Sequence, residues 1–146
     1  MFSVTSLYSG IYKALANDEI ILTLLGLDLT ADDLTKAKRI RRRMVSQELV
    51  SDFPTISLYA LPGHTDGEND RVYYAPFVFD VLTADDEELA MQISERIMDI
   101  FDGEINLFAG VENFEAKMLS QHESKTNLPN TYCFTTVLQF VVSIDA

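Results

Sequence analysis

The chain has 146 residues and a mass of 16.5 kDa, the size of one ordinary domain. Apolar residues make up 47% of it and charged residues 23%, a composition that excludes an intrinsically disordered chain. The longest apolar run, residues 20–27, is far shorter than the roughly 18–20 residues that cross a bilayer, and the first residues lack a signal-peptide pattern. We therefore expect one globular domain over residues 1–146, with no membrane span.

The net charge of −12 is unevenly distributed. Six of the 11 basic residues lie in the segment KAKRIRRR, residues 36–43, so the remainder carries 23 acidic against five basic residues, or −18. A field of this sign repels nucleic acid, because non-specific DNA binding depends on neutralising phosphates. The pattern favours a protein that contacts other acidic proteins or its own copies. The alternative is a solvated charged surface that only keeps the protein in solution.

The N-terminal third predicts two helices and an ambiguous segment. Apolar residues from Val4 to Leu15 recur at helical spacing, and Asp18 can cap a second, short helix that ends at Gly26. Residues 28–52 fit two interpretations. A helix that begins near Thr30 and a loop with a short strand around residues 40–45 agree with the sequence about equally well.

The rest of the chain alternates between strand and helix patterns. Strands are predicted at 53–61, 72–82, 114–120 and 132–144, and a helix at 85–101 with Thr83 or Asp85 as its cap. Pro76 inside the second strand predicts a bulge or an unpaired side there. The fold class is therefore α+β: an antiparallel four-stranded sheet with helices packed on one face, in the order helix–hairpin–helix–hairpin. Six side chains are expected in its core: Leu89, Ile93, Ile97, Phe134, Leu138 and Phe140.

The sequence offers no pattern of catalytic, cofactor-binding or metal-binding residues. His64, His122 and Cys133 do not have the spacing of a metal site, and no glycine-rich phosphate loop is present. The acidic loop 66–70 does not match an EF-hand and is interpreted as a solvated turn. We predict no cofactor and no enzymatic activity. An enzyme with an unrecognised site stays an alternative, and it would depend on one of these three residues.

Two methionines of the predicted helix 85–101 are candidates for a subunit contact. Met91 and Met98 lie seven residues apart, beside the main apolar stripe. They either widen the stripe that packs on the core or contact a neighbouring subunit, where flexible thioethers pack well.

The order and length of these elements resemble a known family. The resemblance is carried by the N-terminal helix running into DEIILTLLG, by FPTISLYALPG, by YYAPFVFDVLTADDEELAMQISERIMDIFDG and by a terminal hairpin ending in TVLQFVVSI. This layout resembles the tail terminator proteins, also called tail completion or head–tail joining proteins, of long-tailed bacteriophages. The likeness spans most of the chain except residues 28–52, and the segment KAKRIRRR has no counterpart in the family pattern.

The resemblance implies a structural virion protein at the head–tail junction, made in the host cytoplasm. It implies a single tail-terminator-like domain that forms a hexameric ring, caps the tail tube, ends tail growth and provides the surface for head joining. The implied partners are copies of itself, the tail tube protein and a head completion or connector protein, while DNA passes through the ring without specific binding. A small adaptor or immunity-like protein-binding module, which forms no ring, stays the alternative.

The basic segment leads to a hypothesis about assembly. Arginine holds carboxylates well because its planar fork can donate two hydrogen bonds to one group. We expect the arginines of this segment to contact an acidic surface of a neighbouring subunit or tail protein, with the start of the helix 85–101 as the first candidate. The residues of this expected interface are Arg39, Arg41, Arg42 and Arg43 on one side and Asp85, Asp86, Glu87 and Glu88 on the other.

Overall fold

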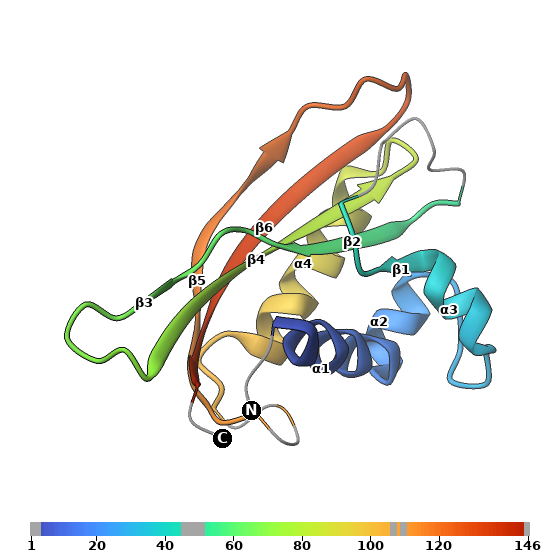
Figure 1. Cartoon of the computed structure of the whole chain (residues 1–146). Helices are drawn as coiled ribbons and strands as arrows, with labels where there is room; N and C mark the ends of the chain where they lie inside the picture. Colours follow the sequence, from blue (N-terminus) through green and yellow to red (C-terminus); the bar gives the residue numbers. More distant parts are fainter. Residues whose placement is uncertain (1–3, 45–51, 106–107, 109–110, 145–146) are drawn as a thin grey trace.

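In the computed structural model, which describes residues 4–44, 52–105, 108 and 111–144, helices pack against one twisted sheet (Figure 1). The sheet has the strand order β1-β2-β4-β6-β5, and β3 also pairs with β4. No helix among the described residues is long and apolar enough to cross a membrane. The elements in chain order are α1 (Val4–Ala16), α2 (Glu19–Leu24), α3 (Asp33–Arg39), β1 (Ile40–Arg41), β2 (Thr55–Ala60), β3 (His64–Thr65), β4 (Val72–Thr83), α4 (Glu87–Phe101), β5 (Asn113–Ser124) and β6 (Tyr132–Ser143).

The predicted fold class, an antiparallel four-stranded sheet in the order helix–hairpin–helix–hairpin, is wrong. The sheet has six strands and is mixed, because β1 pairs parallel to β2 while the other pairs are antiparallel. Three helices precede the first strand, where the predicted order gives a single helical element. Strand β3 was not predicted, and β1 was predicted only as one of two alternatives, because two residues are too few to produce an alternating pattern in the sequence.

The four longer strands and the main helix lie where the sequence predicts them. The segment 28–52 contains both predicted alternatives in succession, since α3 runs directly into β1. Asp32 caps α3 through the N–H of Thr35, two residues after the predicted start. Residue 45, the end of the predicted short strand, lies outside the described residues, which resume at residue 52.

Pro76 does not produce a bulge. It pairs in register with Gln139 of β6, and its carbonyl accepts a hydrogen bond from Leu61 N–H just after β2 has ended. The missing N–H of proline is tolerated at this position because the neighbouring strand stops there. The register shifts lie on the edge strand β5 instead, between Asn113 and Glu115 and between Met118 and Ser120.

The core lies between the sheet and helices α1, α2 and α4. Alternate residues of β2, β4 and β6 face these helices, as the two-residue period of a strand requires. Of the side chains predicted to be in the core, four are fully buried: Ile93, Ile97, Leu138 and Phe140. The prediction was wrong for Leu89 and Phe134, which are only partly buried and pack at the margin of the core.

One ion pair connects the short helix α2 to α4. Asp18 caps α2 by accepting a hydrogen bond from Ile21 N–H, as predicted. The same carboxylate accepts two hydrogen bonds from the guanidinium of Arg96 on α4, at 2.7 and 3.0 Å. These hydrogen bonds lower the pKa of the Asp18 carboxyl. The pair therefore fixes α2, which has only six residues, to the longest helix.

We expect Asp18→Asn to lower the free energy of unfolding by about 1–2 kcal/mol at neutral pH, since Asn still caps α2 but loses the charge that binds Arg96. Because the pKa of Asp18 is lowered in the folded state, its stabilisation is present above the unfolded-state pKa and is lost as the pH falls through the folded-state value. The difference from the wild type should shrink in acid. Urea unfolding across this pH range measures it, with the exposed Glu19→Gln as control; equal stability at neutral pH would contradict the role of the pair.

Candidate interaction surface

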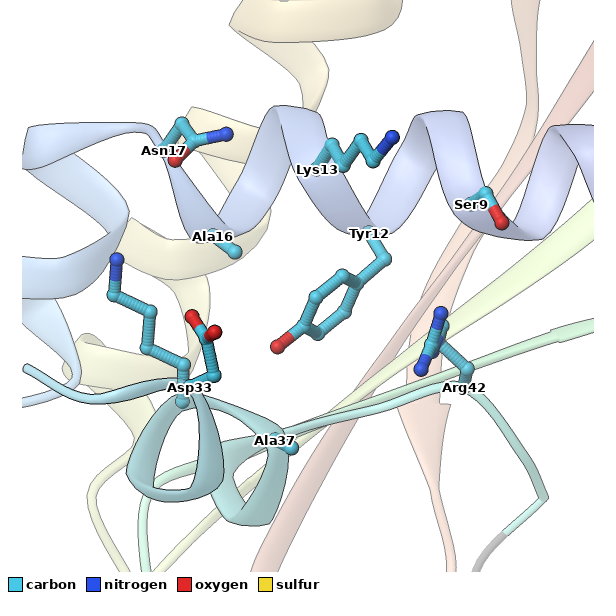
Figure 2. A pocket seen from close by; sticks show the side chains of 9 residues that line it. Ser9, Tyr12, Lys13, Ala16, Asn17, Asp33, Ala37 and Arg42 are labelled. Atoms are coloured by element: carbon cyan, nitrogen blue, oxygen red, sulfur yellow. The ribbon is translucent and has the colours of Figure 1, made fainter.

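A surface pocket of about 390 Å³ lies between α1 and α3, and residues of the basic segment 36–43 form part of its lining. Figure 2 shows Tyr12 reaching from α1 into the space between Asp33 and Arg42. The guanidinium carbon of Arg42 lies 4.6 Å from the centroid of the Tyr12 ring, a cation–π contact. The residues that line the pocket are Ser9, Tyr12, Lys13, Ala16, Asn17, Asp33, Lys36, Ala37 and Arg42.

The pocket has an excess of positive charge. Lys13, Lys36 and Arg42 contribute three cations, against the single carboxylate of Asp33. Lys36 is buried, whereas Arg42 is exposed. Burial raises the pKa of the Tyr12 hydroxyl, and the charge of Arg42 opposes this shift, so Tyr12 is neutral at physiological pH. This arrangement can accept an additional carboxylate, such as an acidic side chain of another protein.

Arg39 differs from the other arginines of the basic segment, because its side chain donates to two carbonyls that are distant in the sequence. Its Nε donates to the carbonyl of Pro54 at 2.8 Å and its Nη2 to the carbonyl of Leu25 at 2.6 Å. The side chain therefore connects the end of α2 to the start of β2. Sequence reasoning could not separate Arg39 from its neighbours, since both acceptors are backbone atoms 14 and 15 residues away.

The remaining arginines lie at the surface. Arg41 is partly exposed and its Nε donates to the carbonyl of Lys38 at 3.2 Å. Arg42 and Arg43 are exposed, and the Arg43 carbonyl accepts a hydrogen bond from the Ser57 hydroxyl. The side chains of Arg42 and Arg43 are thus exposed just after β1, and that of Arg41 is partly exposed at its end.

The acidic candidates are exposed at the beginning of α4. Asp86 is the cap of this helix, accepting from Leu89 N–H at 3.0 Å, so neither Thr83 nor Asp85 has the predicted capping role. Asp85 has a positive φ of 55°, and Glu87 and Glu88 form the first helical turn. Within the described part of the chain, the basic segment forms no ion pair with these four acidic residues.

The two methionines of α4 have different environments. Met91 is 40% exposed, which leaves it accessible to another protein. Met98 is partly buried and packs against the main core. Of the two, only Met91 has the exposure that a contact with a neighbouring subunit requires.

None of the alternative enzymatic residues, His64, His122 and Cys133, lines the pocket. Cys133 is buried on the sheet face opposite the helices, and burial, together with the Asp80 carboxylate, raises the pKa of its thiol to about 12. His64 on β3 stacks on Tyr74, and His122 lies on the edge strand β5. Among the residues that the structure describes, no three His, Cys, Asp or Glu side chains are grouped as metal ligands.

Comparison with known proteins finds a shared fold. No protein-family model matches the chain, and no curated protein sequence matches it. Among solved structures, the chain is similar to one described as "Virion of native gene transfer agent (GTA) particle", with a TM-score of 0.66 and 14% sequence identity. The similarity covers 96% of this chain and 96% of that chain. The two chains therefore share a fold over nearly their whole length.

We expect Arg39→Ala to lower the free energy of unfolding by about 1–3 kcal/mol, because two partly buried carbonyls lose a charged donor. The matched change Arg43→Ala removes an exposed guanidinium and should alter stability by less than about 0.5 kcal/mol. Urea unfolding of both variants tests this. Equal effects of the two changes would contradict a structural role for Arg39.

We expect the Cys133 thiol to be inert in the folded protein, since a thiol with a pKa of about 12 contains almost no thiolate at neutral pH. A thiol-reactive dye should label the protein only after unfolding in denaturant. Because the chain has one cysteine, Cys133→Ser gives the background. Labelling of the native protein at the rate of the unfolded chain would contradict this expectation.

Proposed function

We propose that this protein is a structural component of a virion, and specifically a tail terminator of a long-tailed bacteriophage. The observation that carries the proposal is the fold shared with a chain of a gene transfer agent virion along 96% of both chains. The order and length of the elements, which resemble the tail terminator family, support the more specific role.

In this proposal the chain is a single tail-terminator-like domain, and six copies form a ring at the head–tail junction. The ring caps the tail tube, ends its growth and provides the surface that a head completion or connector protein joins. DNA passes through without specific binding, which suits a chain with a net charge of −12. The protein acts without catalysis and without a cofactor.

The basic segment has a role in this assembly. Arg41, Arg42 and Arg43 are exposed or partly exposed, and we propose that they contact an acidic surface of a neighbouring subunit or tail protein. The start of α4, from Asp85 to Glu88, is one candidate surface, and Met91 follows it on the same helix. The pocket beside Arg42, with its three cations, supports contact with a carboxylate. Arg39 supports this surface indirectly, by fixing the chain around it.

The oligomeric state tests the proposed function. We expect native mass spectrometry and electron microscopy to find rings of six copies, either alone or on purified tail tubes, and we expect added protein to stop tube growth in vitro. A monomer or dimer at every concentration, with tubes that keep growing, would contradict the proposal and favour an adaptor module.

Replacing Arg41, Arg42 and Arg43 together with Ser should weaken capping of tail tubes. Exposed ion pairs contribute only about 0–1 kcal/mol each, so a measurable loss requires all three changes. The loss should be largest at low salt, because the screening length is only about 8 Å at physiological ionic strength. Capping titrated at low and high salt measures the effect. Unchanged capping would leave the arginines as a solvated surface, and normal capping with poor DNA retention would assign them to the channel.

A further inference from the structure

The outer edge of the sheet at β5 exposes large apolar side chains. Ile105 belongs to this edge because the preceding residue, Glu104, pairs with Ala116 through a backbone hydrogen bond. The side chains are between 42% and 59% exposed, although each is large enough to be a core residue. We refer to these four residues as the β5 edge: Ile105, Phe114, Met118 and Leu119.

The backbone groups at the outer side of β5 are hydrogen-bonded along the first part of the strand, up to Met118. The N–H and carbonyl of Ala116 pair with Glu104 and Gly103, and Met118 N–H donates to the Asp102 carboxylate. After the register shift that follows Met118, the backbone groups of successive β5 residues point alternately toward β6 and away from it. The N–H and carbonyl groups of Gln121 and Glu123 point away from β6, and no described residue forms a backbone hydrogen bond with them. Proteins normally protect such an edge, since it can pair with another chain.

The opposite edge of the sheet has the complementary character. The strand order places β1 at one border and β5 at the other. We refer to Arg41, Arg42, Arg43 and Met44 as the β1 edge, and its one apolar member, Met44, is 65% exposed. The β5 edge, in contrast, is flanked by the exposed acids Glu104 and Glu115. One border is basic; the other is apolar and carries the two acids Glu104 and Glu115 beside one exposed base, Lys117.

We propose that the β5 edge of one copy docks against the β1 edge of a second copy. This inference rests on the proposed ring and names its subunit contact. A contact between two different patches of one chain is heterologous, and repetition of such a contact closes into a ring when the rotation between subunits is suitable. The β5 edge buries its apolar side chains against Met44 and the aliphatic stems of the arginines, while Glu104 and Glu115 meet the guanidinium groups.

The first test places a charge in the apolar part of the contact. Leu119→Lys should raise the concentration at half-assembly of rings about tenfold or more, measured by native mass spectrometry and on tail tubes. Ile20→Lys is the matched control, because Ile20 on α2 is similarly exposed, at 50% against 52% for Leu119. Both variants should show the wild-type urea midpoint, since both side chains are at the surface. Ring assembly by Leu119→Lys at wild-type concentrations would overturn the inference.

The second test identifies the acidic partner by charge reversal. Arg42→Glu with Arg43→Glu should impair assembly, and adding Glu104→Lys with Glu115→Lys in the same chain should restore it, because every contact in the ring then has both charges reversed. The comparison chain carries Glu87→Lys with Glu88→Lys on the same arginine background. Restoration by the changes at Glu104 and Glu115 supports the inference.

The two proposals fail in different ways. Restoration only by the changes at Glu87 and Glu88, or by neither set, overturns the contact proposed for the β5 edge. It does not contradict the proposal that the protein forms a ring. Absence of rings in the wild type, alone and on tail tubes, instead contradicts the proposed function itself.

Discussion

The fold depends on aromatic packing between the sheet and α4. Phe101 at the end of this helix contacts Phe79 of β4 and Phe140 of β6, with ring centroids 5.8 and 5.7 Å apart. Phe77 extends the cluster to Tyr8 of α1, at 5.0 Å and nearly edge to face. Such geometry adds to the large area that each ring buries. Helices from distant parts of the chain are thereby held on one face of the sheet.

This packing determines which surfaces stay available for contacts. The helices cover one face of the sheet. The other face carries the buried Cys133 thiol and the Asp80 carboxylate, which accepts two hydrogen bonds. The two surfaces of the proposed contact lie at the borders of the sheet, at β1 and β5. Arginines cluster at β1, and four of the exposed large apolar residues lie at β5. The β1 edge and the β5 edge therefore lie at opposite borders of the sheet.

Elements with a long, regular pattern were predictable from the sequence. Strand β6 alternates over 12 residues, β4 is a β-branched and aromatic run of the same length, and α4 has a continuous apolar stripe, so packing and local preference agree. Strand β5 extends four residues beyond its predicted end. The prediction stopped early because Gln121 to Ser124 are polar on both faces of this edge strand and give no alternating pattern. The two-residue strands β1 and β3 have no period to detect.

Contacts between residues distant in sequence were not predictable. The cap by Asp18 is a local pattern, but its pairing with Arg96, 78 residues away, depends on how α2 and α4 meet. The candidate interface is a similar case. The arginines were visible as a cluster, yet the commitment of Arg39 to two carbonyls and the stacking of Arg42 on Tyr12 follow from tertiary packing.

In the proposed contact, the irregular shape of β5 limits aggregation through this exposed edge. Two register shifts bend the strand, and charged residues such as Glu115 and Lys117 occur along it, so a continuous ladder with another copy of β5 is disfavoured. Contact through side chains with a basic, differently shaped border is still possible. Such an edge therefore favours a head-to-tail contact between unlike surfaces over the pairing of like strands, and a repeated head-to-tail contact closes into a ring when the rotation between subunits is suitable.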